Sequence, residues 1–331
     1  MDAAGGRRWC SRIGQVGEHE LTPDGLILRR NARTAGLSDH SLQAATRHGT
    51  LERVYWGMYL PSGSAGELLT REQRQHRYRY KVLGAVDAGR GDKAVSHWSA
   101  AALWGMPMLG GDLERVHFTA NRAGGGRDRT RACTLHATPW QPDEVIELPG
   151  LLVTTPARTA VDISRAGTFE QGVCACDAAL RMGATRLELE TIVARAGRRK
   201  GIGTARRAVA FADVAAESIG ESWSRALMSA MGDIPVPELQ PEIHDSDGVF
   251  AARTDFRIKG TLLGEFDWYD KYIRYLKPGE SPADAVYREK RREERLNELG
   301  FTVARWGWDD LMNPDRLRRI LRNGLRRTGY A

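Results

Sequence analysis

The sequence predicts a mixed α/β chain that is built from several α+β domains. Three observations support this prediction. The chain has 331 residues, which is long for one domain and suits two or three. Hydrophobic residues make up 41% of it, which is enough for buried cores. Helical and strand-like patterns follow one another along the chain and are separated by stretches rich in Gly, Pro and charge.

Charge and cysteine content narrow the possible functions. The formal net charge of +7 favours an anionic partner such as nucleic acid, although many basic proteins use such a charge only for solubility. The four cysteines form no C-x-x-C pair, so we expect neither a zinc site nor a disulfide framework from them. No stretch approaches about 18 apolar residues, and the start MDAAGGRRWC has no apolar signal region, so we expect a cytoplasmic protein with no membrane partner.

The sequence pattern at the N-terminus predicts a flexible tail over residues 1–24 and a small DNA-binding domain over 25–65. An apolar run at 26–28 precedes a first helix, and Ser38 is the expected N-cap of a second helix that ends at Arg47. Two short strands follow, at 51–56 and 58–60. In this arrangement the second helix enters the major groove, with Arg47 and Arg53 near phosphates. Any small α+β unit with a solvated basic face explains the pattern equally well.

The residues of this segment resemble a known family. The run GLSDHSLQAATRHGTLERVYWGMYLP, with its turn at Gly57-Met58-Tyr59, is similar to the winged-helix domain of AbiEi-type antitoxins. The phrases SHWSAAALWGMP (96–107) and TTPARTAVDISRA (154–166) resemble the middle region of the same proteins. The resemblance implies a DNA-binding regulator, with a cognate toxin or self-association as possible further partners.

The pattern over residues 66–215 predicts an α+β middle domain. No residues in it are spaced as a catalytic motif would require. The basic residues within 66–90 predict a helix, which we interpret as a solvent-exposed connecting helix more readily than as a DNA contact. Thr155 is the expected N-cap of a later helix, whose first residue is Pro156. We expect His97, His117 and His136 to be isolated packing or surface residues. The region is therefore interpreted as scaffold.

Residues 216–331 carry the candidate chemistry. The pattern predicts a helix from Ser218 to Met231, strands at 249–258 and 261–267, a helix at 287–299 and a strand at 301–306. Carboxylates that converge from adjacent strands can hold Mg²⁺ or Mn²⁺, and such an ion polarises a phosphoryl group and activates a bound water. Asp255 on the first strand and Glu265 on the second are therefore the expected metal ligands.

The turn between these strands decides whether the two carboxylates meet. A two-residue loop at 259–260 would pair 258 with 261 and place Asp255 and Glu265 on opposite faces. A three-residue loop at 258–260 would pair 257 with 261 and return both to one face, with Gly260 in the left-handed region. The chemistry thus predicts the three-residue loop.

Each acidic residue also has a structural explanation. Glu221 can form a capping box with Ser218, and Asp255 can pair with Arg253 or Arg257. Glu265 lies among core-type residues, where its charge requires compensation by a cation or a metal ion.

The same residues resemble the PD-(D/E)XK nuclease superfamily, in particular the family related to very-short-patch-repair endonucleases. The resemblance is carried by Asp255-Phe256, by Glu265-Phe266-Asp267 and by the ending R-E-x-x-L-x-x-x-G-x-x-V-x-R over 292–305. It implies a restriction-endonuclease-like αβββαβ fold, Asp255 and Glu265 as metal ligands, Glu221 as an auxiliary acid that completes the metal site, and Arg292 and Arg305 near phosphate or in structural roles.

Two departures from the family pattern leave catalytic turnover open. Asp267 stands where the superfamily usually has Lys, and Lys271 occupies the position of a His in the close relatives. Lys271 could steady the attacking water or the transition-state charge. The arginine-rich tail, including Arg316 and Arg319, can form a basic helix face for the phosphate backbone, or be a solvated terminal helix.

Two functions of different classes follow. The first is a double-stranded-DNA-binding protein with a Mg²⁺-dependent endonuclease domain, acting in genome defence or repair. The second is a non-catalytic, antitoxin-like transcriptional regulator whose nuclease fold is degenerate. An RNA-directed nuclease is a third possibility, because nothing in the sequence distinguishes DNA from RNA.

Overall fold

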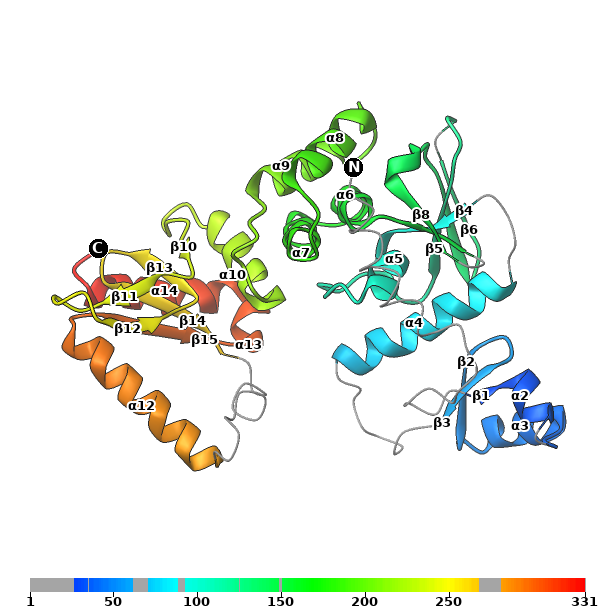
Figure 1. Ribbon diagram of the computed structural model, residues 1–331, viewed down its shortest axis with the longest axis horizontal. Helices are drawn as coiled ribbons and strands as arrows, with labels where there is room; N and C mark the ends of the chain where they lie inside the picture. The colour runs from blue at the N-terminus through cyan, green and yellow to red at the C-terminus, as the bar shows by residue number, and fades with distance from the viewer. Residues whose placement is uncertain are drawn as a thin grey trace.

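The computed structural model describes residues 27–34, 36–61, 71–88, 93–124, 126–148, 151–267 and 281–330. It confirms a mixed α/β architecture with several helices and several separate sheets (Figure 1). Residues 1–24 and Lys271 lie outside the described residues. No helix within the described ranges is long and apolar enough to cross a membrane.

The N-terminal part is a three-stranded antiparallel sheet with two helices. The strand order is β1-β3-β2, and Leu42 packs with Tyr59 in a small core. The Ser38 hydroxyl accepts a hydrogen bond from the Ser41 N–H, so the expected N-cap is confirmed. Gly57 adopts φ 74° in the tight turn between the last two strands. The elements are β1 (Ile27–Leu28), α2 (Arg29–Thr34), α3 (Asp39–Arg47), β2 (Leu51–Tyr55) and β3 (Met58–Pro61).

Helix α4 (Arg71–Ala88) connects this part to the middle of the chain. Tyr78 and Tyr80, which alternate with basic residues in the sequence, are both buried. The Tyr78 hydroxyl lies 2.6 Å from the Ser99 Oγ and donates to the Arg115 carbonyl at 2.7 Å. Burial of these rings makes α4 a packed connection between two cores.

The middle part is a six-stranded mixed sheet covered by helices. Its order is β6-β7-β5-β4-β9-β8, and Figure 1 shows the helices gathered on the side that faces the C-terminal part. Every residue of α5 is buried, as the small-residue sequence SAAALW allows. The elements are β4 (Lys93–Val95), α5 (His97–Trp104), β5 (Val116–Ala120), β6 (Arg127–Arg129), β7 (Cys133–Ala137), η2 (Pro142–Glu144), β8 (Val145–Leu148), β9 (Leu151–Thr154), α6 (Pro156–Ala166), α7 (Phe169–Arg181), α8 (Arg186–Ala196) and α9 (Ile202–Phe211).

Helix α10 (Ile219–Ser229) lies between the middle and C-terminal cores. Ala226 belongs to the first core, whereas Leu227 and Met228 belong to the second. Arg225 forms a buried ion pair with Asp177 of α7 at 3.1 Å. The two parts therefore share one helix and are not separated by a flexible linker.

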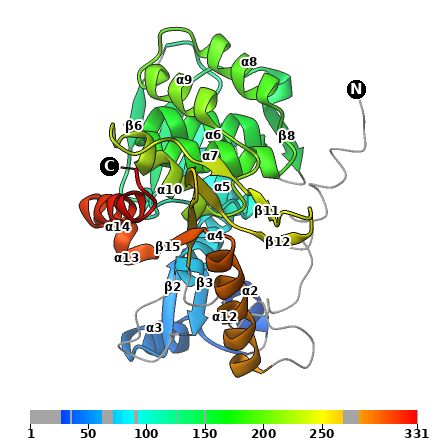
Figure 2. The same ribbon diagram turned by 90° about the vertical axis from the view of Figure 1, so that its left-hand side faces the viewer.

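The C-terminal part is a four-stranded sheet of order β10-β13-β14-β15 with helices on both faces. Figure 2 shows α13 and α14 on one side of this sheet and α12 on the other. The first face packs Leu262 and Trp306 against α10 and α14, and the second packs Leu263 against Leu296 of α12. The elements are β10 (Glu238–Leu239), β11 (Glu242–His244), β12 (Phe250–Arg253), β13 (Phe256–Lys259), β14 (Leu262–Phe266), α12 (Pro282–Glu298), β15 (Thr302–Trp306), α13 (Trp308–Leu311) and α14 (Pro314–Arg327).

The expected strand at 249–258 is divided in two. β12 pairs with β11 and β13 pairs with β10, and the break at Thr254–Asp255 faces a break at Gln240–Pro241. Two backbone hydrogen bonds still cross the break, from the Gln240 N–H to the Asp255 carbonyl at 3.0 Å and from the Thr254 N–H to the Pro241 carbonyl at 3.2 Å. Pro241 has no N–H to return the second bond, so the regular ladder is interrupted there. Asp255 therefore lies in a bend that leads into β13.

The three-residue loop between β13 and β14 was a wrong prediction, although its consequence holds. Lys259 pairs with Leu262 around a two-residue turn, in which Gly260 has φ 52°. A bulge at Ile258 then shifts the register by one, so that Arg257 pairs with Leu263. Continuing this register places position 255 opposite 265. The bulge thus brings both carboxylates to the face that carries α12.

Candidate functional site

A cavity of ≈ 510 Å³ lies where α10, the β12–β13 bend, β14 and α12 meet. Both carboxylates and guanidinium groups line it, so it is a charged site. Three of the residues expected to hold a metal ion line this cavity together: Glu221, Asp255 and Glu265. Its other charged lining residues are Glu217, Arg253, Asp267, Arg288, Glu289 and Arg292.

Glu265 is the buried centre of this site. Its side chain is 4% exposed, and its two oxygens contact Arg292 at 2.5 Å and Arg305 at 3.2 Å. The compensation expected for a carboxylate among core residues is therefore supplied by two cations. Burial lowers the pKa of Arg305, but its hydrogen bond to Glu293 and the charge of Glu265 outweigh burial and raise that pKa above its ordinary value.

Asp255 is held by the strand beside it. Asp255 lies in the bend that precedes β13, and its Oδ2 accepts a hydrogen bond at 2.8 Å from the N–H of Phe266, the last residue of β14. This contact orients the carboxylate toward the same cavity as Glu265. Arg253 pairs with Glu217 at 2.9 Å and Arg257 with Glu238 at 3.6 Å.

Glu221 lies in the first turn of α10 and satisfies backbone and side-chain donors. Its Oε2 accepts from the Glu217 N–H at 2.9 Å and from Gln240 Nε2 at 2.8 Å, while Ser218 Oγ accepts from the Glu221 N–H. Burial is the main reason that the pKa of Glu221 is raised. The expected capping box is therefore only half formed: Ser218 caps the helix, whereas the Glu221 carboxylate binds the residue before the cap and also lines the cavity.

The donor set suits a hard divalent cation in kind but is not gathered around one point. Carboxylate oxygens are the ligands that Mg²⁺ prefers. Among the described residues, however, no three of these acidic side chains have oxygens within 4.8 Å of one another. Asp267 lies 3.5 Å from Arg305, and Lys271 is outside the described residues. A cation at this site would share Glu265 with two arginines.

Of the arginines expected to contact nucleic acid, Arg292 and Arg305 lie at Glu265, and the other four lie on two separate surfaces. Arg47 ends α3 and Arg53 lies on β2; both are exposed, and the Arg53 guanidinium lies 5.3 Å from the Trp56 ring centroid. On the other surface, Arg316 of α14 pairs with Asp310 at 2.6 Å, whereas Arg319 is exposed.

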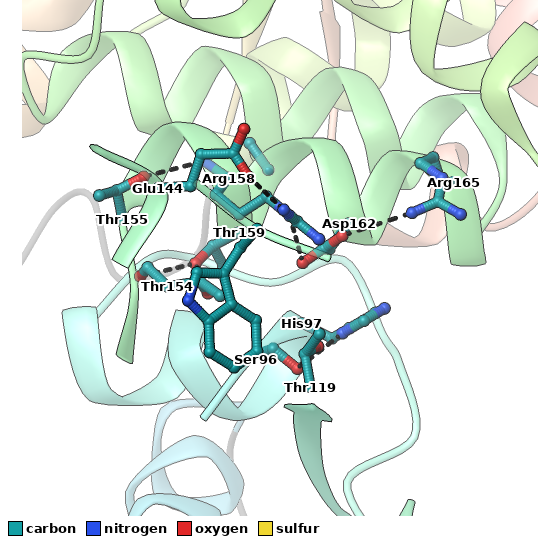
Figure 3. A network of polar contacts seen from close by, with 12 residues as sticks. Ser96, His97, Thr119, Glu144, Thr154, Thr155, Arg158, Thr159, Asp162 and Arg165 are labelled. Carbon is teal, nitrogen blue, oxygen red and sulfur yellow. Dashed lines mark hydrogen bonds and ion pairs between the residues drawn. The ribbon is translucent and has the colours of Figure 1, made fainter. Parts of the chain in front are cut away.

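The predictions from the sequence did not include a buried ionic network in the middle part (Figure 3). Arg158, 4% exposed, contacts Glu144 and also Asp162, the latter at 3.0 Å. Arg195 joins from outside at 3.2 Å from Glu144. The spacing of Arg158 and Asp162, one helical turn apart, was the only local signal.

The sequence also missed a cluster of histidines. His97, His117 and His136 were expected to be isolated, but all three are buried and their ring nitrogens lie within 4.8 Å of one another. Burial lowers the pKa of His136 to about 3 and that of His117 to about 4, so these rings are neutral at pH 7. Adjacent pairing of β5 and β7 places two of the rings together, and no spacing rule indicates that.

Comparison with known proteins finds relatives over most of the chain. The sequence matches none of the models of known protein families. It is 32% identical over 299 residues to the uncharacterized proteins MT2308 and Rv2248 from two strains of Mycobacterium tuberculosis. Each alignment covers 89% of this chain and 100% of the relative. The chain therefore belongs to the same protein family as MT2308 and Rv2248.

Proposed function

We propose that this protein binds double-stranded DNA and hydrolyses phosphodiester bonds with Mg²⁺ or Mn²⁺ at the carboxylate cavity. The observation that carries this proposal is the placement of Asp255 and Glu265 in one cavity, on one face of the sheet, with Glu221 from α10 beside them. With the strands of the four-stranded sheet, the order α10, β10, β13, β14, α12, β15 supports the proposal, because it follows the αβββαβ order of the restriction-endonuclease-like fold that the sequence resembles.

Each residue has a defined role in this proposal. Asp255, Glu265 and Glu221 would hold the cation, which supplies polarisation of the phosphoryl oxygen and a more acidic water. Arg292 and Arg305 contact and orient the Glu265 carboxylate, and their guanidinium groups would be available to an incoming phosphate. Asp267 adds a further carboxylate to the cavity lining.

The N-terminal part would supply the DNA contact. Helix α3 with Arg47, and the β2–β3 ribbon with Arg53 and the 79% exposed Trp56, have the arrangement of a winged helix. Arg319 and its exposed neighbours on α14 would add phosphate contacts. Binding through such groups weakens steeply as salt concentration rises.

Cleavage assays on plasmid and duplex oligonucleotides test the proposal. We expect cleavage with Mg²⁺ or Mn²⁺ and none with EDTA, and Glu265→Gln should slow it by roughly 100-fold or more, because misplacing reacting groups by about 1 Å already costs that much. Glu298→Gln, an exposed carboxamide variant on the same helix as Arg292, is the matched control and should retain wild-type rates. Equal cleavage rates for Glu265→Gln and Glu298→Gln would contradict the proposal.

A second candidate is a non-catalytic DNA-binding regulator, in which the nuclease-like fold serves self-association or a cognate toxin. The contacts of Glu265 with two arginines favour it, because they compensate the buried carboxylate without a metal ion. Sequence-dependent DNA binding without cleavage under Mg²⁺, Mn²⁺ and other divalent ions would support this candidate.

A further inference from the structure

We propose that His97, His117 and His136 bind one divalent transition-metal ion of the zinc type, which ties the start of α5 to strands β5 and β7. Imidazole nitrogen is a preferred ligand of Zn²⁺, Ni²⁺ and Cu²⁺ but not of Mg²⁺. The three rings each offer a nitrogen, and these nitrogens lie within 4.8 Å of one another in a buried place. The site is independent of the carboxylate cavity.

The shortest nitrogen–nitrogen distance agrees with shared coordination. Two imidazoles bound to zinc at 2.0–2.1 Å in tetrahedral geometry have their nitrogens about 3.3 Å apart. His117 Nδ1 and His136 Nε2 are 3.1 Å apart. β5 and β7 run side by side in parallel, with Thr119 paired to His136, so backbone pairing sets this approach.

The remaining nitrogens of two rings have partners of the kind that orient metal-binding histidines. His97 Nδ1 lies 2.9 Å from the Ser96 Oγ, and the Thr119 hydroxyl donates to that same oxygen at 2.7 Å. His117 Nε2 lies 3.3 Å from the Asp112 carbonyl oxygen. Such outer partners engage one ring nitrogen and leave the other to face the ion. Figure 3 shows Ser96, His97 and Thr119 together below the Arg158 network.

The backbone at His97 is also unusual. This residue has φ 53°, a left-handed conformation that side-chain-bearing residues rarely adopt and that is enriched at functional sites. His97 is the first residue of α5, directly after the N-cap Ser96, whose backbone is extended. The conformation places the His97 ring against the other two rings.

The rings must turn slightly to bind one ion. His97 and His136 are stacked, with centroids 3.8 Å apart and planes 15° apart, so their in-plane nitrogen lone pairs lie in two nearly parallel planes. A shared ion requires these lone pairs to converge, and we therefore expect binding to tilt the His97 ring away from this stack. Three protein ligands leave one coordination position for a water molecule.

Equilibrium dialysis of the full-length protein against Zn²⁺, followed by elemental analysis, tests the proposal. We expect one ion per chain that His117→Phe and His136→Phe each lose. His244→Phe, which removes an exposed histidine on β11, and Glu265→Gln, which alters the carboxylate cavity, should both keep it. Zn²⁺ retained by the first two variants, or lost only in Glu265→Gln, would overturn the proposal.

Two measurements on the wild-type chain do not depend on the variants folding. Zn²⁺ should raise the unfolding midpoint by about 5 °C or more at a hundredfold excess over its dissociation constant. Nitrogen NMR of the histidine-labelled protein should show three ring nitrogens shifting on Zn²⁺ addition, with Mg²⁺ inactive. If neither signal changes at saturating Zn²⁺, the cluster is a packing feature and the proposal fails.

Discussion

Two arginine–carboxylate clusters, one in the middle part and one in the C-terminal part, use the same chemistry with opposite charges at the buried centre. In the middle part the centre is a guanidinium: Arg158 lies between Glu144 and Asp162, and all three are at most 4% exposed. Arg195 and Arg165 contact these two carboxylates from the outside, at 3.2 and 3.6 Å. In the C-terminal part, two guanidinium groups serve one buried carboxylate, because Arg292 and Arg305 both contact Glu265 and are 25% and 28% exposed.

This difference separates a structural cluster from an accessible site. Removing the central cation of the first cluster leaves two buried carboxylates whose remaining cations, Arg195 and Arg165, contact them only from the outside, which is costly because little water can replace Arg158. Removing the central anion of the second leaves two cations that are already partly exposed to solvent, of which Arg292 lines the cavity of ≈ 510 Å³. The exposure of the partner side chains, rather than the number of ion pairs, therefore decides how much stability is lost when one charged side chain is removed.

The largest effect is expected from Arg158→Met. Breaking a buried ion pair by removing one partner costs about 3–5 kcal/mol. Urea unfolding should show this loss, while Arg195→Met, which removes the 41% exposed outer arginine of the same cluster, should cost less than about 1 kcal/mol. Similar losses for both variants would contradict a structural role that depends on burial.

A smaller loss is expected where α10 joins the two parts. A Cβ at Gly220 would lie 2.0 Å from the Phe266 ring, so Gly220→Ala should destabilise the C-terminal core by about 1–3 kcal/mol. Gly203→Ala in α9 meets nothing within 4 Å and should instead stabilise its helix by up to about 1 kcal/mol. Denaturant midpoints of the two variants should move in opposite directions.

Glu265→Gln should destabilise the protein less than Arg158→Met. The variant keeps the shape of the side chain, and the remaining arginines retain water and other carboxylates, including Glu289 at 2.8 Å from Arg292. We expect a loss of about 1 kcal/mol, as for one modest polar substitution. A loss as large as that of Arg158→Met would show that this cluster, too, is primarily structural.

The smallest effect is expected at Asp233, an exposed carboxylate that contacts Arg318 and Arg322 of α14. The hydrogen bond from Arg322 is the main reason that its pKa is lowered from the ordinary value of 3.8. A carboxylate with a lowered folded-state pKa stabilises the protein above its unfolded-state pKa and loses that contribution as pH falls further. Unfolding curves of wild type and Asp233→Asn should therefore converge below pH 3.8.

Local signals in the sequence predicted several element boundaries well. Ser38 and Thr155 cap helices as expected, and Pro156 takes the first helical position, because capping depends on a side chain and the backbone N–H groups within three residues of it. Ser218 caps α10 for the same reason. These contacts need no information from distant parts of the chain.

Non-local pairing was beyond such signals. The bulge at Ile258 and the break opposite Pro241 depend on which strands lie side by side, and a shift of one residue moves every side chain to the other face. The partners of Glu265 come from positions 27 and 40 residues further along the chain, so only the need for compensation could be predicted.

The amino-acid sequence by itself determined the mixed α/β composition, the helix caps and the need to neutralise a carboxylate placed among apolar residues. Only the tertiary structure decided that arginines perform this neutralisation, and that three histidines from α5, β5 and β7 converge. The physical reason is that local hydrogen bonding is encoded within one turn of chain, whereas charge compensation and ring convergence depend on which distant strands and helices are packed together.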